Sequence, residues 1–238
     1  MNSDTHSMPY RCAVYFAPAF SSDWWQAGSH WLGRCAASGV HYAPPEIHGT
    51  DTAKFQILTS DPRRYGWHAT LKAPFKLAEG KNVQELSARM QALAQRLHAF
   101  TLPRLQVSTQ GGFLALRPAE TSEQIDATAA ACVKELHDLA MPLGTAELEH
   151  RRKSPLTAEQ DHLLETWGYP WVFEHYKFHL SLTGPLGQTT LHEQDALIKA
   201  AKLRFDVLDN CRFEHLALFI EPQKGANFEL VEWVELKR

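Results

Sequence analysis

Two histidines stand in closely matching sequence contexts, which makes them the first candidates for chemistry. Residues 67–74 read WHATLKAP and residues 178–185 read FHLSLTGP. Both segments run aromatic, His, apolar, hydroxyl, Leu, polar, small, Pro, and His68 and His179 are 111 positions apart (179 − 68). A third His-x-Thr match at residues 48–50 lies beside prolines and glycine, outside any expected strand. The repeated context predicts two related units that bury equivalent faces around a pseudo-twofold axis.

The chemistry that fits two such histidines is the cleavage or formation of a phosphoester bond. Phosphodiester cleavage needs a base for the attacking oxygen and an acid for the leaving oxygen, on opposite sides of phosphorus. An unperturbed histidine titrates near pH ~6.5, so one imidazole can be neutral while the other is protonated. We therefore predict that His68 and His179 are catalytic. The sequence leaves open which one is the acid and which the base.

Alternation along a strand places further polar side chains beside each histidine, because every second residue shares a face. The expected sets are His68, Thr70 and Lys72 in the first segment and His179, Ser181 and Thr183 in the second. Hydroxyl groups can donate to phosphate oxygens, and a lysine can offset the negative charge of the transition state. Thr70, Ser181, Lys72 and Thr183 are therefore predicted to bind phosphate, with a solvated lysine as the alternative for Lys72.

Three other residues are candidates for substrate contact. Arg11 and Tyr15 share one face of the first expected strand and can reach the substrate if that strand adjoins residues 67–75. Tyr176, like Tyr65, precedes a histidine segment and can stack on a ligand or hydrogen-bond to it. Core packing is the competing interpretation for both tyrosines.

Two further patterns carry less weight. Residues 149–153 read EHRRK; this basic run is typical of a solvated loop, but Arg151 and Arg152 could hold a second phosphate. His175 and His179 have the spacing of metal ligands on a helix, yet the expected strand over residues 173–182 would separate them by ~13 Å. We predict no metal site and no cofactor.

The remaining sequence indicates elements of both kinds without strict alternation. Strands are expected over residues 10–16, 67–75, 172–183, 213–220 and 228–236, and a hairpin over 105–108 and 112–116 with Gly111 and Gly112 at its turn. Helices are expected over residues 22–33, 82–100, 121–140, 157–167 and 190–203, and residues 40–64 are expected to be mostly irregular. This order predicts an α+β fold with largely antiparallel sheets and a groove between them.

Composition is that of an ordinary globular protein. The 238 residues are 44% hydrophobic and 21% charged, with a net charge of −3, so no overall positive field attracts nucleic acid. No apolar run approaches a membrane span, and the four cysteines form no C-x-x-C pair. We expect one bilobal domain over residues 1–238 with a loose tail over 1–9, in a reduced, cytoplasmic setting, with no membrane partner.

The quoted segments resemble a known group of proteins. YGWHATLKAPF and YKFHLSLTGP are similar to the paired His-x-Thr/Ser signatures of the two-histidine phosphoesterase superfamily, which includes RNA cyclic phosphodiesterases. With AVYFAPAF, GSHWLGR and WGYPWVFEHYKFHLSLTGP, the chain more closely resembles the domain of unknown function 1045 family, encoded with phosphonate-degradation genes.

The resemblance implies a bilobal α+β fold with a central cleft and metal-free hydrolysis of a cyclic phosphate or another phosphodiester. It assigns catalysis to His68 and His179 and phosphate binding to Thr70 and Ser181, and it suggests a phosphoribosyl cyclic phosphate as substrate. Ser181 stands where the family often has Thr, which keeps the hydroxyl group.

Three functions remain open at this stage. The first is hydrolysis of a small phosphorylated substrate, a sugar phosphate or nucleotide. The second is action on RNA ends with a 2′,3′-cyclic phosphate, which the net charge of −3 disfavours. The third is a non-catalytic nucleotide- or phosphate-binding module, which would not need both histidines. Activity should be bell-shaped in pH and insensitive to EDTA.

Overall fold

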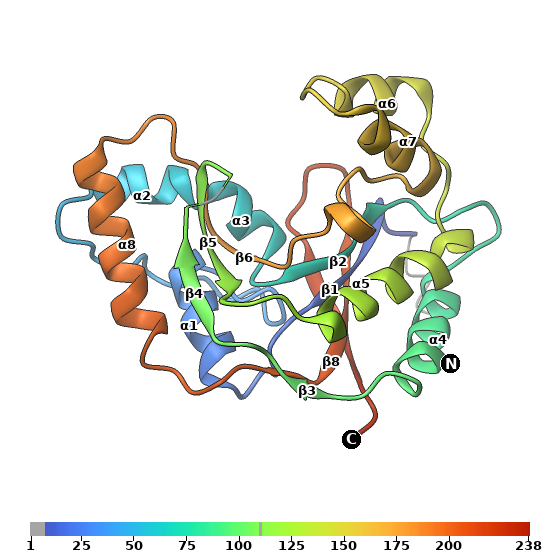
Figure 1. Ribbon diagram of the computed structural model, residues 1–238, viewed down its shortest axis with the longest axis horizontal. Helices are drawn as coiled ribbons and strands as arrows, with labels where there is room; N and C mark the ends of the chain where they lie inside the picture. The colour runs from blue at the N-terminus through green and yellow to red at the C-terminus, as the bar shows by residue number, and fades with distance from the viewer. Residues whose placement is uncertain (1–7, 110) are drawn as a thin grey trace.

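A computed structural model of the chain describes residues 8–109 and 111–238, and it confirms the predicted α+β fold with antiparallel sheets. Most of the tail expected over residues 1–9 lies outside the described residues. The two main sheets are four-stranded and three-stranded, and a two-stranded ribbon joins β3 (Phe100–Thr101) to β7 (Arg212–Phe213). Figure 1 shows both main sheets with helices packed around them.

The four-stranded sheet carries the first histidine segment. Its order is β2 (Ala69–Phe75), β1 (Arg11–Phe16), β8 (His215–Glu221) and β9 (Glu229–Glu235), with every neighbouring pair antiparallel. Helix α5 (Glu123–Glu135) packs on β2, and α4 (Val83–Ala94) packs on β8 and β9. The apolar residues of β1 and β8 are buried except for the partly buried Ile220, so this sheet forms the centre of the hydrophobic core.

The three-stranded sheet carries the second histidine segment. It runs β4 (Leu105–Ser108), β5 (Phe113–Pro118) and β6 (Leu180–Pro185), again antiparallel. The β4–β5 pairing confirms the predicted hairpin, whose turn includes residue 110, outside the described part of the chain. Helix α8 (Leu191–Phe205) contacts β4, while α1 (Asp23–Leu32) contacts β6. The two histidine segments therefore belong to different sheets.

The predicted starts of three helices are confirmed by their capping bonds. Thr190 and Glu193 form a reciprocal capping box on α8, and Thr157 and Gln160 form one on α7 (Ala158–Trp167). Each box satisfies backbone N–H groups that a first turn leaves without an intrahelical acceptor. Asn82 likewise accepts from the backbone N–H of Glu85 at the start of α4.

The prediction that residues 40–64 are mostly irregular is wrong for their second half. Two helices form there, α2 (Thr52–Leu58) and α3 (Ser60–Tyr65). The Asp51 carboxylate accepts from the backbone N–H groups of Ala53 and Lys54, which starts α2. Pro62 falls in the first turn of α3, where its missing N–H group interrupts no intrahelical bond.

The strand expected over residues 172–183 is also corrected, because β6 begins only at Leu180. A short 3₁₀ turn, η2 (Phe173–His175), precedes it, and Phe173 has a φ of 53°. The argument that His175 and His179 are splayed along one strand is therefore wrong. His175 Nε2 instead lies 3.1 Å from a carboxylate oxygen of Glu159.

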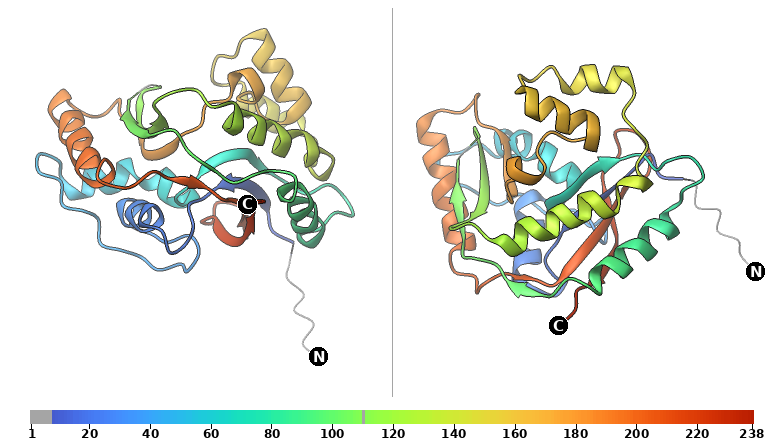
Figure 2. Two further views of the ribbon diagram at one scale, coloured as in Figure 1. Left: turned by 60° about the horizontal axis from the view of Figure 1, so that its bottom comes forward. Right: turned by 45° about the vertical axis from the view of Figure 1, so that its right-hand side comes forward.

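The basic run at residues 149–153 spans the end of a helix that was not predicted from the sequence. Helix α6 (Thr145–Arg151) follows α5 and the 3₁₀ turn η1 (His137–Leu139), and α7 follows α6. In Figures 1 and 2 the α6–α7 pair forms a projection above β2. In the described part of the chain, no helix is long and apolar enough to cross a membrane.

Candidate active site

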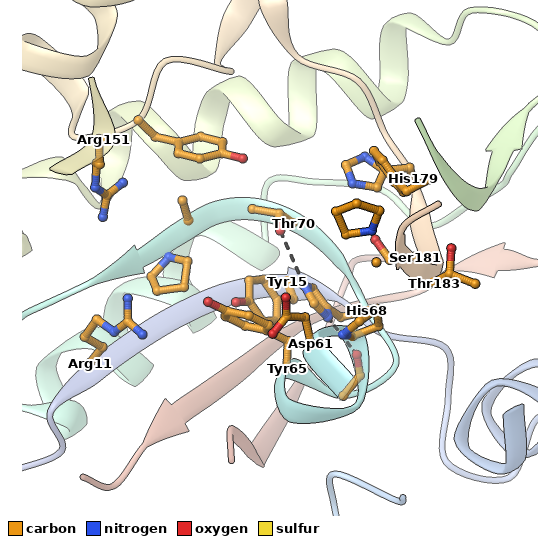
Figure 3. A pocket seen from close by; sticks show the side chains of 18 of the residues that line it. Arg11, Tyr15, Asp61, Tyr65, His68, Thr70, Arg151, His179, Ser181 and Thr183 are labelled. Atoms are coloured by element: carbon orange, nitrogen blue, oxygen red, sulfur yellow. Dashed lines mark hydrogen bonds between the residues drawn. The ribbon is translucent and has the colours of Figure 1, made fainter. Parts of the chain in front are cut away.

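A cavity of about 520 Å³ lies between the two sheets, and both histidines line it (Figure 3). Strand β2 with its preceding residue His68 forms one wall, and β6 with its preceding residue His179 forms the other. The cavity also takes residues from β1, α3, β5 and α6. His68 and His179, 111 positions apart in the sequence, therefore line the same cavity.

Local structure fixes the first histidine in one orientation. Trp67 is fully buried and stacks on Phe205 with ring centroids 5.5 Å apart, so the next side chain points out of the core. His68 Nδ1 lies 2.8 Å from the carbonyl oxygen of Gly66. A carbonyl only accepts, so Nδ1 carries the proton and the neutral ring presents the lone pair of Nε2. Gly66 has a φ of +84°, which favours glycine at this turn.

The second histidine repeats this arrangement. Phe178, the residue before it, is 6% exposed and packs against Phe16 with centroids 5.4 Å apart. His179 Nδ1 lies 2.7 Å from the carbonyl oxygen of Lys177. The carbonyl two residues upstream thus orients each ring and selects the same tautomer, with Nε2 left for the substrate.

Burial makes both imidazoles harder to protonate. Removal from water lowers the pKa of His68 from 6.5 to about 4, and the nearby His179 ring adds to this effect. Burial also lowers the pKa of His179, and the Arg117 guanidinium contributes in the same direction. Both rings are therefore neutral near pH 7. A bound anion would favour their protonated forms.

The hydroxyl residues predicted to accompany the histidines lie at the cavity. Thr70 and Ser181 line it, and Thr70 Oγ1 is 3.4 Å from His68 Nε2. Thr183 also lines the cavity, but it is 1% exposed and its Oγ1 accepts from the backbone N–H of Leu114 at 3.0 Å. Thr183 therefore joins β6 to β5.

Lys72 is not at this cavity, which corrects its placement beside His68. The register between β1 and β2 is irregular between Cys12 and Tyr15, so simple alternation fails along β2. Lys72 is 4% exposed and lines a separate cavity of about 170 Å³, with its ammonium 5.1 Å from the Phe75 ring centroid. Burial lowers its pKa from 10.5 to about 8.

Of the other predicted contact residues, Arg11 and Tyr15 line the cavity and Tyr176 does not. The Tyr15 ring stacks on the His68 ring with centroids 3.8 Å apart. Tyr176 lines an adjoining cavity of about 400 Å³ that shares Thr70 and His179 with the first. Its hydroxyl donates to the carbonyl oxygen of Thr70 at 2.8 Å, which ties the second histidine segment to the first.

Several lining residues were not identified from the sequence. Asp61 comes from α3, in the region expected to be irregular, and Phe113 and Tyr169 come from β5 and the segment after α7. Of the two arginines in the basic run, Arg151 lines the cavity. Arg152 does not, because its guanidinium is paired with Asp161 and Glu165.

No group of three or more His, Cys, Asp or Glu side chains within residues 8–109 and 111–238 is arranged to hold a metal ion. The polar groups that line the cavity are imidazole, hydroxyl and guanidinium groups, together with the carboxylates of Asp61 and Glu147. The first three kinds suit an anionic oxygen ligand.

Comparison with known proteins places the chain in a family. Residues 70–229 match the family described as "Protein of unknown function (DUF1045)", so the chain belongs to that family, as its segments predicted. The matched region includes Thr70, His179 and Ser181 and starts two residues after His68.

Two curated relatives share the name ribose 1,5-bisphosphate phosphokinase PhnN. The one from Janthinobacterium sp. (strain Marseille) is 38% identical over 226 residues, covering 94% of this chain and 49% of the relative. The one from Laribacter hongkongensis (strain HLHK9) is 39% identical, covering 95% and 52%. The chain therefore spans about half the length of these relatives.

Among solved structures, the chain resembles Escherichia coli LigT and a protein described as a phosphoesterase. LigT in complex with NADP⁺ gives a TM-score of 0.41 at 12% identity, covering 98% of this chain and 100% of LigT. A structure described as a phosphoesterase gives 0.39 at 10% identity, covering 97% and 100%. Likeness at this level says nothing about the site.

Proposed function

We propose that this chain is a phosphodiesterase that opens a cyclic phosphate on a small phosphorylated substrate. The observation that carries the proposal is the pair of imidazoles on opposite walls of one cavity, each with Nδ1 bonded to a backbone carbonyl. That bond leaves Nε2 of each ring for proton transfer. Two such groups are what in-line hydrolysis of a phosphodiester requires.

The reaction adds one water molecule across one P–O bond. One neutral imidazole accepts a proton from water through Nε2 as the water oxygen bonds to phosphorus. The bond from phosphorus to one ring oxygen breaks, and the other histidine, protonated when the anionic substrate is bound, donates its proton to that oxygen. The product is a phosphate monoester and a free hydroxyl group. Thr70 and Ser181 donate to the non-bridging oxygens as charge develops on them.

The names of the relatives support a sugar phosphate as the substrate. The two relatives that align with this chain over about half their length are named for ribose 1,5-bisphosphate. Water attack on a 1,2-cyclic phosphate of ribose 5-phosphate, with cleavage of the bond to O2, yields that compound. This chain would then make the substrate that a kinase of that name consumes.

Kinase activity is not proposed for this chain itself. Its sequence contains no Gly-x-x-x-x-Gly-Lys-Ser/Thr run, the loop with which many kinases cradle nucleotide phosphates. The cavity instead presents two histidines and two hydroxyl residues to the ligand.

The test is a screen of cyclic phosphates with the native protein and the His68→Ala/His179→Ala double variant. We expect the native protein to release a monoester from 5-phosphoribosyl 1,2-cyclic phosphate, and the double variant to release none above background. Preferred turnover of RNA ends carrying a 2′,3′-cyclic phosphate would change the substrate but keep the reaction. Binding without turnover by the native protein, or full turnover by the double variant, would overturn the proposal.

A further inference from the structure

The end of the cavity away from the histidines has a different chemistry. Two arginines line it, Arg11 from β1 and Arg151 from the last turn of α6. In Figure 3 they lie at the end opposite His68 and His179, with their guanidinium groups reaching toward each other across the cavity. Their side chains are 18% and 19% exposed, so both guanidinium groups are largely withdrawn from bulk water.

Each arginine is held in place while some of its donors remain available. Arg11 Nε donates to a Glu221 carboxylate oxygen at 2.5 Å. Arg151 donates to the carbonyl oxygen of Gly168 at 2.8 Å and to Glu147 at 3.0 Å. A guanidinium has five N–H donors. Glu221 accepts one from Arg11, whose guanidinium also interacts with the Tyr65 side chain, and Gly168 and Glu147 accept two from Arg151. The others can bind a ligand.

Three guanidinium groups and two carboxylates lie at this end, and the Asp61 carboxylate also lines the cavity. Glu221, whose side chain is fully buried, is shared by Arg11 and Arg64, so two guanidinium groups face one carboxylate. Arg151 is balanced by Glu147. The remaining N–H donors and the low exposure of both arginines favour an anion between them, since charge-assisted bonds to guanidinium are strong where water is excluded.

The distance between this end of the cavity and the histidines is longer than one phosphate group. Tyr15, whose ring stacks on His68, pairs with Thr70 on β2, while Arg11 is four residues away on the same strand. Four residues of extended chain span about 13 Å. The distance from the Arg11 guanidinium to the histidine end is shorter, because the side chain reaches into the cavity. Two neighbouring phosphates of a pyrophosphate share one oxygen and lie too close together to fill both ends. A sugar between two phosphates fits better.

We propose that Arg11 and Arg151 form a binding site for a second, terminal phosphate monoester of the substrate. This inference rests on the proposed function at the histidine end. It narrows the substrate class to cyclic phosphates that carry a phosphate monoester several bonds away. A planar guanidinium matches two oxygens of a phosphate, so the two arginines select doubly phosphorylated molecules and set which way the sugar lies. Because Arg151 comes from α6, the α6–α7 projection takes part in substrate recognition.

The kinetic test compares 5-phosphoribosyl 1,2-cyclic phosphate with ribose 1,2-cyclic phosphate, which lacks the terminal phosphate. We expect the native protein to prefer the first in kcat/KM. In Arg151→Gln this preference should fall about 10- to 100-fold, mostly through KM, because a hydrogen-bonded charge contact is lost. The matched control is Arg152→Gln, one residue along, whose side chain is paired with Asp161 and Glu165 outside the cavity. It should keep the native preference.

Arg11→Lys is the second variant, because it keeps a cation beside the buried Glu221 and removes the planar fork. We expect it to weaken the preference as well, with a folded protein confirmed by circular dichroism. An equal loss for both substrates in Arg151→Gln, or no preference in the native protein, would overturn the second phosphate site. It would leave hydrolysis at the histidines standing.

A binding measurement makes the inference independent of turnover. Calorimetry measures the affinity of ribose 1,5-bisphosphate and of ribose 1-phosphate for the native protein, Arg151→Gln and Arg152→Gln. The site predicts tighter binding of the bisphosphate to the native protein and to Arg152→Gln, and loss of the difference in Arg151→Gln. If that pattern appears without any hydrolysis, the proposed reaction fails and the phosphate site stands. Equal binding of both ligands by the native protein rejects the site.

Discussion

The two histidine segments share one plan but differ in what surrounds each ring. In both, a buried aromatic residue anchors the strand entry, and the carbonyl two residues before the histidine accepts from Nδ1. In both, a cavity-lining hydroxyl residue follows two positions later. The shared plan explains how two sequences of eight residues, far apart in the chain, present equivalent Nε2 atoms to one cavity.

The difference lies in the rings packed around each imidazole. His68 is stacked on Tyr15 at 3.8 Å, with Phe219 at 6.0 Å and Tyr65 at 6.2 Å between ring centroids. The ring contact found for His179 is the edge of Phe113, at 5.4 Å. Burial lowers the pKa of both histidines, and the pKa of His68, with more rings keeping water from it, falls to about 4. The comparison favours His68 as the base and His179 as the acid.

The largest effects should come from replacing the histidines. Each of His68→Ala and His179→Ala should lower kcat by about 10²- to 10⁴-fold on a cyclic sugar phosphate. The two differ in how the loss depends on the leaving group. A nitrophenolate needs no proton to leave, so His179→Ala should recover much of its rate on a nitrophenyl phosphodiester, whereas His68→Ala should not.

That comparison has a built-in control, because both variants are assayed on the same two substrates. Recovery in His68→Ala and not in His179→Ala would exchange the two roles. Equal recovery in both would mean that neither histidine protonates the leaving oxygen. The losses in the double variant should not add, since acid and base act in one step.

Replacement of the hydroxyl groups should cost less. Thr70→Val and Ser181→Ala each remove a donor to the substrate without touching the histidine backbone bonds. We expect about a tenfold loss of kcat/KM for each, the usual scale for one hydrogen bond to a charged group. Thr183→Val tests whether Thr183 differs from Ser181 in role, because the Thr183 hydroxyl accepts from the backbone N–H of Leu114. It should lower stability more than it lowers kcat/KM.

The repeated segments could be predicted from sequence because each follows local rules. The start of each strand has a local pattern, which is a buried aromatic residue, a histidine and then alternating hydroxyl and leucine residues. This pattern does not depend on the rest of the chain. Lys72 shows where alternation fails. An irregular register between β1 and β2 turns its side chain into another cavity, and that register depends on strand pairing that the segment alone does not reveal.

The other parts of the site depend on long-range packing and could not be predicted from the local sequence. Asp61 belongs to a helix whose proline suggested a break, although a first-turn proline is compatible with a helix. Arg151 and Arg152 are equivalent in sequence, yet only Arg151 reaches the cavity, since Asp161 and Glu165 of α7 hold Arg152. Their separate environments follow from how α6 packs on α7, which the local sequence does not specify.

A smaller effect should follow from removing the ring stacked on His68. Tyr15→Leu opens that face of the imidazole to water, so the pKa of His68 should rise from about 4 toward 6.5. The acidic limb of the kcat/KM profile should then move to higher pH. Tyr15→Phe keeps the stacked ring and should leave the limb in place. Proton NMR titration of the His68 ring measures the shift directly, and an unchanged pKa in Tyr15→Leu would contradict the desolvation argument.

The smallest expected effect is on stability, and it again separates the two histidines. Between pH 4 and 6.5 the unfolded chain protonates residue 68 while the folded chain does not, because the folded pKa is lowered to about 4. The unfolded state then binds more protons, so the free energy of unfolding rises with pH across this window. His137 and His215, whose pKa values are also lowered by burial, act in the same direction. Only the difference between the native protein and a variant therefore isolates one histidine.

Urea unfolding at pH 5 and pH 7 measures how much the free energy of unfolding changes with pH. This change should be smaller in His68→Gln than in the native protein. His179→Gln should reduce it less, because fewer rings exclude water from that site, and a larger reduction in His179→Gln would reverse the assignment of base and acid.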